Sequence, residues 1–429
     1  MTERTTRLLS AGIVVVAALL LGIRLGGDWR YLHDDNGAMQ TTLALSHVKA
    51  GLAATRGHDV FTDRETGVRS PYGHHPPGIA LLLAGAFSLA GSAEPAVARG
   101  VVALFHLGSL LCAAWLLRRL FPRGPALAGT LAFAILPMGA YFGRMVNYEA
   151  PCLLGVLLQL VGFAMHRETG ERCGLGLLAA GIVVSGFFDW PAFFFAAAIG
   201  LVAAVDALRG DAGARRTFFL AAGVSVAVLG LDLLHLAWAA GGSLETLTSV
   251  AGSSAQGVTP LTRPWKFLAG QLESYRRYFS HSGVAASLLA AALVLAPRAG
   301  LSRPLLAGAA GALRRRLLVV SGGAATAYVL AAPSWASIHP YWKFYFLPFV
   351  ALSVALLFAA LGRLPRRLAV LAGVLVVVEM AASSAYMLRL RHTREGAYAI
   401  EAAARVRARD LRPEDVFPPG PAARGGRTR

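Results

Sequence analysis

Two groups of polar side chains could do chemistry in a sequence that is otherwise mostly apolar. Asp34 and Asp35 follow the first apolar segment, and His74 and His75 stand directly before a pair of prolines further along the chain. A carboxylate at such a place can act as a general base, and an imidazole can contact a phosphate or a sugar hydroxyl. We therefore interpret residues 31–78 as the candidate site and the remaining chain as its scaffold.

Each of these residues also has a purely structural interpretation. Asp34 or Asp35 could cap a helix that starts near Gly37. If the pair is instead extended, the two side chains point to opposite faces, so that only one of them would face a substrate. The prolines force His75 into an extended conformation, which suits either a phosphate contact or a rigid connection into the next helix. We favour a functional role for at least one aspartate and leave both interpretations open for the histidines.

A divalent cation is a further possibility for the same stretch, because carboxylates and imidazoles both bind metals. The candidate ligands would be His33, Asp34, Asp35, His74 and His75. Their spacing matches no fixed metal-binding pattern. We therefore do not favour a metal site, and the sequence points to no certain cofactor.

Polar side chains also gather at the ends of two later apolar runs. They are Arg144, Asn147 and Glu149 in the first segment, and His339, Tyr341, Lys343 and Tyr345 in the second. As substrate-binding residues, the carboxylate could bind an acceptor and the cations could bind a lipid phosphate. The structural alternatives are a helix-start carboxylate favoured by the helix dipole and an aromatic belt at a membrane interface. Asp189, which precedes Trp190 and Pro191, is expected to cap a helix.

The composition places the chain among membrane proteins that cross the bilayer many times. Of its 429 residues, 56% are hydrophobic and only 15% are charged, and the mean hydropathy is +0.56. The net charge of +18 comes from short basic clusters between apolar runs. This pattern is typical of cytoplasmic loops and not of a nucleic-acid-binding face, so we exclude nucleic acid as a partner. The cysteines imply no disulfide framework.

Apolar runs separated by basic clusters predict an all-α polytopic membrane protein with about eleven transmembrane helices. The transmembrane domain would cover residues 1–388, and a short polar tail would follow over residues 389–429. The basic clusters fall on one side of the predicted membrane, and residues 28–95 form a large first loop on the other side. Within this loop, residues 37–51 and 78–91 are expected to form interfacial helices. Residues 241–281 are predicted as a second outer loop.

The order of these motifs resembles that of the GT-C superfamily of glycosyltransferases, which use sugars carried on polyprenyl phosphate. It is most similar to the branch of the protein O-mannosyltransferases and the lipid A aminoarabinose transferases. The resemblance rests on the acidic pair, on His75-Pro76-Pro77, on the segment from Arg144 to Glu149, and on the segment from His339 to Tyr345. Many relatives have Asp-Glu in place of the Asp-Asp pair, and they usually have Asp in place of Glu149.

The resemblance implies an inverting glycosyltransferase in a bacterial inner membrane, with its active site facing the periplasm or exterior. Asp34 or Asp35 would be the catalytic base, and Asp34 is slightly favoured by its position after the first span. The donor would be a hexose or pentose on a polyprenyl phosphate such as undecaprenyl phosphate. The acceptor would be a hydroxyl of a cell-envelope glycan, lipid or protein.

A polytopic transporter or lipid flippase without glycosyl transfer is the alternative function. It predicts ionisable residues near the middle of the spans. The few candidates in or near apolar runs are scattered along the chain: His106, Asp206, Asp232, His235 and Glu379.

Overall fold

The computed structural model describes residues 2–62, 69–71, 74–239, 263–296 and 302–396. Residues 397–429, which are most of the predicted tail, lie outside the described residues. Residues 240–262 of the predicted second outer loop also lie outside them.

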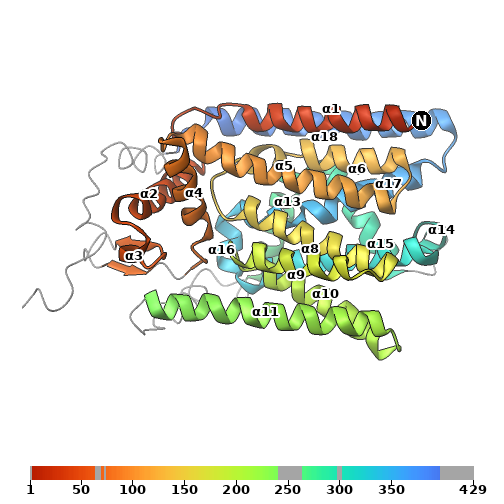
Figure 1. Cartoon of the computed structure of the whole chain (residues 1–429). Helices are drawn as coiled ribbons and strands as arrows, with labels where there is room; N and C mark the ends of the chain where they lie inside the picture. Colours follow the sequence, from red (N-terminus) through yellow and green to blue (C-terminus); the bar gives the residue numbers. More distant parts are fainter. Residues whose placement is uncertain (1, 63–68, 72–73, 240–262, 297–301, 397–429) are drawn as a thin grey trace, which may run out of the picture.

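The described chain is a bundle of long apolar helices that run along one common direction (Figure 1). Apolar runs form helices in lipid because each backbone polar group must be satisfied within the segment. The long helices are α1 (Glu3–Gly22), α5 (Pro95–Leu120), α8 (Glu149–Thr169), α9 (Arg172–Gly186), α10 (Pro191–Leu208), α11 (Ala212–Ala239), α13 (Pro264–Leu295), α15 (Gly308–Ala331), α17 (Leu347–Leu361) and α18 (Arg366–Thr393). The shorter ones are α6 (Arg123–Ile135), α7 (Pro137–Phe142), α14 (Ser302–Leu306), α16 (Pro333–Ile338) and the 3₁₀ helix η1 (Pro340–Phe346).

Within the described residues, eight helices are long and apolar enough to cross a membrane. They are α1, α5, α8, α10, α11, α13, the continuous η1–α17 pair and α18. This confirms the prediction of an all-α polytopic membrane protein. The number of about eleven crossings stays a prediction, because other expected spans fall on shorter helices such as α6 and α9.

Glycines let α8 and α9 approach each other closely. A Cβ added at Gly155 would lie 2.4 Å from the backbone nitrogen of Ser185, and one added at Gly162 would lie 2.4 Å from that of Leu178. Small residues are typical of helix interfaces in membranes, where close van der Waals packing drives association. Because α8 and α9 are consecutive and antiparallel, the start of α8 and the end of α9 lie at the same end of the bundle.

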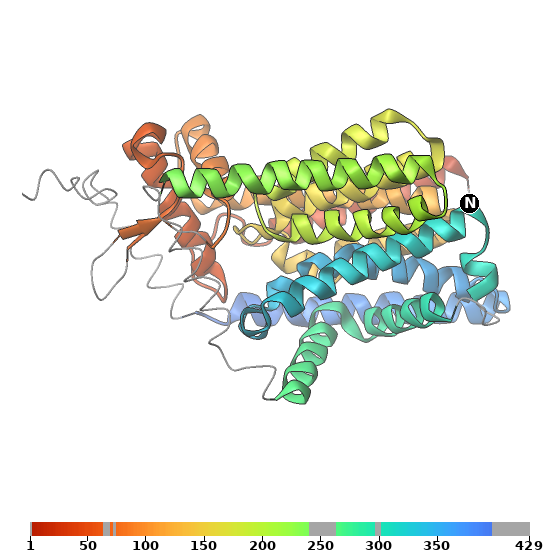
Figure 2. The ribbon, with the colours of Figure 1, turned by 90° about the horizontal axis from the view of Figure 1, so that it is seen from below.

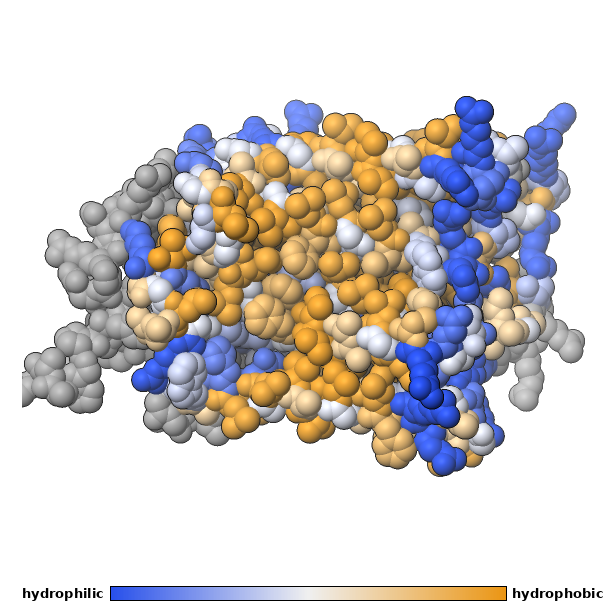
Figure 3. Space-filling model, viewed as in Figure 1, coloured by the Kyte–Doolittle hydropathy of each residue, from blue (hydrophilic) through white to orange (hydrophobic). Residues whose placement is uncertain are grey.

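The two ends of the bundle differ in charge. At one end Arg118 lies 3.1 Å from Glu3, and Arg316 lies 2.8 Å from Asp206. Figure 3 shows this end as a hydrophilic band beyond an apolar belt. The basic clusters therefore gather at the end opposite the first loop, as the charge pattern predicts.

The first loop folds into a small head across the other end of the bundle (Figure 1). The head holds α2 (Asp34–Ala50), α3 (Leu52–Thr55), α4 (Gly78–Ala90) and an antiparallel hairpin of β1 (Val60–Thr62) and β2 (Arg69–Pro71). The two strands were not predicted from the sequence. The 13 residues of α4 reach only about 20 Å, which is less than the hydrocarbon thickness of about 30 Å. As expected, α4 lies across the bundle end and not along it.

The predicted conformation of the acidic pair was wrong. Helix α2 begins at Asp34 and not near Gly37, so Asp34 and Asp35 occupy its first turn. Carboxylates at this position are favoured by the helix dipole, which explains the earlier start. The two side chains consequently point about 100° apart around the helix axis and not to opposite faces.

The prediction of a loop up to residue 281 was also wrong. Residues 264–281 belong to α13, which bends at Ser280 where φ is 64° and ψ is 170°. The charged residues that suggested a loop pair along the helix, with Glu273 at 2.8 Å from Arg276 and 3.2 Å from Arg277. Such pairs at spacings of three and four residues stabilise a helix. Figure 2 shows the first part of α13 leaving the bundle at an angle.

Candidate functional site

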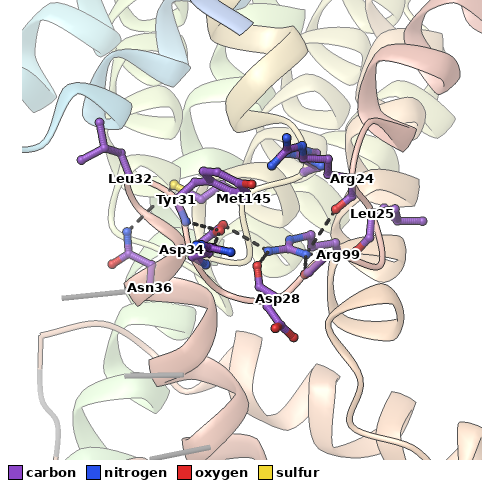
Figure 4. A network of polar contacts seen from close by, with 12 residues as sticks. Arg24, Leu25, Asp28, Tyr31, Leu32, Asp34, Asn36, Arg99 and Met145 are labelled. Carbon is purple, nitrogen blue, oxygen red and sulfur yellow. Dashed lines mark hydrogen bonds and ion pairs between the residues drawn. The ribbon is translucent and has the colours of Figure 1, made fainter. Parts of the chain in front are cut away.

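Asp34 is held in the first turn of α2 by backbone and side-chain donors (Figure 4). Its Oδ2 accepts hydrogen bonds from the amides of Arg30 at 3.0 Å and Tyr31 at 2.9 Å, and its Oδ1 lies 3.2 Å from the Arg99 guanidinium. Arg99 also stacks over the Trp29 ring at 4.2 Å. Burial raises the pKa of Asp34, and the charge of Arg99 opposes this rise. Asp34 thus stabilises the segment that connects α1 and α2.

Asp35 has fewer protein partners than Asp34. Its side chain is partly exposed, and no side chain among the described residues forms a hydrogen bond or ion pair with it. Burial raises the pKa of Asp35, amides at the start of α2 oppose the rise, and the charge of Asp34 adds to it. Of the two carboxylates, Asp35 is therefore the one better able to meet a substrate.

Arg144 lies with Asp34 and not with the residues that follow it in the sequence. Its guanidinium donates to the carbonyl of Ile23 and lies 3.1 Å from the His392 ring. Burial lowers the pKa of Arg144 to about 10, and the charge of Arg99 acts in the same direction, so the group stays protonated at neutral pH. The concentration of positive charge around one carboxylate suits an anionic ligand.

His75 and Asp189 form a second polar cluster where α4 begins. His75 Nδ1 lies 2.8 Å from Asp189 Oδ1, and the His75 ring stacks on Tyr148 with centroids 4.2 Å apart. Tyr345 donates from its hydroxyl to Asp189 Oδ2 at 2.7 Å, and the Trp190 amide donates to Oδ1 at 2.8 Å. The Asp189 side chain is 1% exposed, whereas that of His75 is 16% exposed. His75 therefore connects a buried carboxylate with the surface of the head.

Glu149 is buried at the start of α8, next to this cluster. Asn147 donates from Nδ2 to Glu149 Oε1 at 3.2 Å. Glu149 Oε2 and Asn147 Oδ1 are buried and have no hydrogen-bond partner within the described part of the chain. Buried polar atoms without partners cost free energy, so these oxygens are places where a ligand hydroxyl could donate.

The 3₁₀ helix η1 and the residue before it, His339, lie between the group around Asp34 and the cluster around Asp189. The Tyr341 hydroxyl lies 2.8 Å from His339 Nδ1, and the Tyr341 ring meets the His33 ring edge-on at 5.5 Å. Burial lowers the pKa of His339 to about 4 and that of His33 to about 3, so both are neutral at pH 7. Further along η1, Tyr345 reaches the second cluster. All the predicted site residues thus lie in or beside one end of the bundle.

His74, which neighbours the second cluster, contributes through its backbone as well as its ring. Its ring meets Trp335 edge-on at 6.2 Å, and its carbonyl accepts a hydrogen bond from the Trp190 indole. Burial lowers the pKa of His74, and the charge of His75 acts in the same direction. These contacts give His74 a structural function in holding the approach to α4.

An apolar groove of about 930 Å³ lies between α13, α15 and the η1–α17 segment. Its lining includes Leu272, Leu288, Leu330 and Phe349, and Lys343 lies at the η1 side. The Lys343 side chain is buried, and its Nζ donates to the Ala336 carbonyl at 3.3 Å. This lining suits a long apolar molecule with an anionic group at one end.

Most of the ionisable residues inside the bundle have local contacts, whereas Asp232 Oδ2 is buried without a hydrogen-bond partner among the described residues. Asp206 binds arginines at the basic end, including Arg316. His106 stacks on Phe133 with centroids 5.4 Å apart. Glu379 accepts the amide of His281 at 3.0 Å and so caps the second part of α13. These contacts give no support to a transport pathway.

Among the residues that the structure describes, no group of three or more His, Cys, Asp or Glu side chains is placed to hold a metal ion. His33, Asp34, Asp35, His74 and His75, which the sequence offers as ligands, are divided between separate contacts. His33 faces Tyr341, Asp34 binds Arg99, and His75 binds Asp189.

Comparisons with known proteins agree with this architecture. Residues 74–229 match the family described as dolichyl-phosphate-mannose-protein mannosyltransferase. The structure is similar to that of ArnT from Cupriavidus metallidurans bound to undecaprenyl phosphate, with a TM-score of 0.57 and 14% identity over 93% of this chain and 77% of that one. At this low identity the likeness shows that the two proteins share a fold.

A second structure of similar fold is that of the Archaeoglobus fulgidus oligosaccharyltransferase. It matches with a TM-score of 0.58 and 14% identity over 90% of this chain. This chain spans only 55% of the length of that archaeal protein. A comparison with curated protein sequences gave no match.

Two residues of the candidate site were not predicted from the sequence. One is Arg99, the partner of Asp34. A cation near the start of an apolar run is unusual, and this could have marked Arg99 as a candidate. Asp189 was expected only to cap a helix. It does accept the Trp190 amide, but its contacts with His75 and Tyr345 join segments that are distant in sequence. No local pattern could have shown them.

Proposed function

We propose that this protein is an integral-membrane inverting glycosyltransferase. It moves a sugar from a polyprenyl-phosphate carrier to an acceptor hydroxyl at the head end of the bundle, which we assign to the outer face of a bacterial inner membrane. The observation that carries the proposal is the apolar groove that ends at buried Lys343, beside the polar clusters of the head. A lipid-linked donor needs an apolar groove for its lipid chain and polar side chains for its phosphate and sugar. The similar ArnT structure is bound to undecaprenyl phosphate, and an archaeal one is in complex with dolichol-phosphate.

The base in this proposal comes from the Asp34–Asp35 pair, and the geometry favours Asp35. Asp34 is occupied by Arg99 and two backbone amides, whereas the Asp35 carboxylate has no side-chain partner in the described chain. Asp35 would remove the proton from the acceptor hydroxyl. The acceptor oxygen then forms a bond with the anomeric carbon as the bond from that carbon to the phosphate oxygen breaks, which inverts the configuration.

Cationic groups stabilise the leaving phosphate in this scheme. The electron pair of the breaking bond passes to the phosphate oxygen, and fixed donors that meet the developing charge lower the barrier. Lys343 would bind the phosphate at the end of the groove, and His75 and Arg144 would face it from the two clusters. The acceptor class follows from the location: a hydroxyl of a cell-envelope glycan, lipid or protein, with Asn147 and Glu149 as candidate contacts.

Binding of undecaprenyl phosphate to the purified protein tests the donor site directly. Lys343→Met keeps an apolar stem and removes the charge, so it should weaken binding about tenfold or more, as expected for a charge-assisted contact. Lys49→Met, at an exposed lysine in α2, is the matched control and should bind normally. Equal affinity of wild type and Lys343→Met would contradict the placement of the phosphate.

A further inference from the structure

Asp189 has no part in the mechanism above, yet its carboxylate receives three hydrogen bonds. His75 Nδ1 and the Trp190 amide meet Oδ1, and the Tyr345 hydroxyl meets Oδ2. Capping of α10 accounts for the Trp190 contact alone. A carboxylate that is 1% exposed is costly unless such partners satisfy it. The contacts with His75 and Tyr345 satisfy this buried charge, and the contact with His75 also fixes one edge of an imidazole that reaches the surface of the head.

We propose that Asp189 is a positioning residue that orients His75 toward the leaving phosphate of the donor. This inference rests on the glycosyltransferase function proposed above. A carboxylate that accepts from Nδ1–H fixes the imidazole tautomer and favours the protonated ring. Stacking on Tyr148 fixes the plane of the ring. The ring edge that carries Nε2 is opposite the edge held by Asp189, and the His75 side chain is partly exposed.

The chemical step needs only a hydrogen bond from this ring. As the bond between the sugar and the phosphate breaks, its electron pair passes to the phosphate oxygen, and Nε2–H of protonated His75 donates to that oxygen. No proton has to leave the ring. Transfer should therefore depend on a proton at Nε2 as well as one at Nδ1, and the pH profile of kcat/KM should have an alkaline limb.

The groups around His75 come from every element packed against it. His74 in the same loop, Tyr148 before α8, Asp189 between α9 and α10, and His339 before η1 interact with His75. Glu149 at the start of α8 and Tyr345 in η1 interact in turn with Asp189. Of these described groups, Asp189 is the carboxylate in hydrogen-bond contact with the ring.

The test compares the pH dependence of kcat/KM in two variants that act in opposite directions. Asp189→Asn removes the charge, so the alkaline limb should move to lower pH and kcat should fall about tenfold or more, with little change in donor KM. Tyr345→Phe removes a donor that disperses the Asp189 charge. The protonated ring should then be favoured more strongly, and the limb should move to higher pH.

Asp59→Asn is the matched control, because Asp59 is a buried carboxylate of the head that lies 3.3 Å from His47. The alkaline limb of the kcat/KM profile should stay at the same pH in this variant. If the pH of the alkaline limb is unchanged in both Asp189→Asn and Tyr345→Phe, the inference is wrong even if the rates fall. If Asp189→Asn does not fold, as judged by gel filtration and thermal unfolding, Tyr345→Phe decides the question alone.

A readout without turnover separates this inference from the proposed function. In ¹⁵N-histidine spectra of the wild type, His75 should carry its proton on Nδ1, and Asp189→Asn should change this signal. An unprotonated Nδ1 in the wild type overturns the inference. Absence of transfer by the wild type, combined with a protonated Nδ1, would instead contradict the proposed function.

Discussion

At the residue scale, the acidic pair divides into one tethered carboxylate and one that is accessible. Asp34 is bound by Arg99 at 3.2 Å and by two amides, and Asp35 has no side-chain partner among the described residues. Sequence reasoning found the pair but favoured Asp34, because position relative to the first span was the available guide. The Arg99 contact, which changes this preference, comes from a helix far away in the chain and could not be predicted.

Replacing each aspartate by asparagine tests this division. Asp35→Asn removes the proton acceptor with little change of shape, so kcat should fall about 10²- to 10⁴-fold while donor binding is kept. Asp34→Asn should lower kcat less and should also lower the thermal stability, because Arg99 loses its partner. Glu94→Gln, at an exposed carboxylate before α5, is the control. Normal turnover by Asp35→Asn would refute its role as the base.

The pH dependence gives a second test at the same scale. Because burial raises the pKa of Asp35 above the ordinary value of 3.8 and the charge of Asp34 adds to it, the ionised base should be lost at a higher pH than in an exposed aspartate. The acid limb of kcat/KM should therefore move to lower pH in Asp34→Asn, which removes the like charge. An unchanged acid limb would argue against Asp35.

At the scale of elements, the groove between α13, α15 and α17 is the proposed site for the lipid chain of the donor. Hydrophobic periodicity and charge alternation predicted helices at these places. The groove itself was not predictable, because it depends on how α13 bends at Ser280 and on which faces of the helices meet. The loop assigned to residues 264–281 was wrong for the same reason, since part of this segment lines the groove.

Filling the groove should impair donor use and leave folding intact. A Cβ at Gly323, which lines the groove in α15, meets nothing within 4 Å, so Gly323→Leu should be tolerated and should occupy space meant for a lipid chain. The KM for a polyprenyl-phosphate sugar should rise several-fold, measured with purified protein. Gly223→Leu in α11, where a Cβ also meets nothing, should leave the KM unchanged. An equal effect of both variants would contradict the groove as the lipid site.

At the scale of the whole molecule, charge separates the two ends of the bundle. The basic clusters that hold Arg118 and Arg316 lie at one end, and the head lies at the other with arginines of its own that contact polar side chains. The sequence alone predicted this arrangement, because positive charge near short loops determines orientation in the membrane. The short size of α4 and its position across the bundle were predicted on the same grounds.

Cysteine labelling in intact cells tests the orientation. In a background without Cys112, Cys152 and Cys173, an impermeant thiol reagent should label a cysteine at position 94 in the head. It should not label one at position 118 until the cells are opened. Labelling of position 118 in intact cells would place the head inside the cell and remove the basis for an external glycosyltransferase.

The proposed function requires a polyprenyl-phosphate sugar as the donor. Mass spectrometry of lipids from a strain that lacks the protein tests this most directly, and it also identifies the sugar. A polyprenyl-phosphate-linked sugar should accumulate in the deletion strain and in a strain carrying Asp35→Asn. It should return to its normal amount with wild type or Glu94→Gln. Unchanged amounts of every polyprenyl-phosphate sugar in the deletion strain would contradict the account.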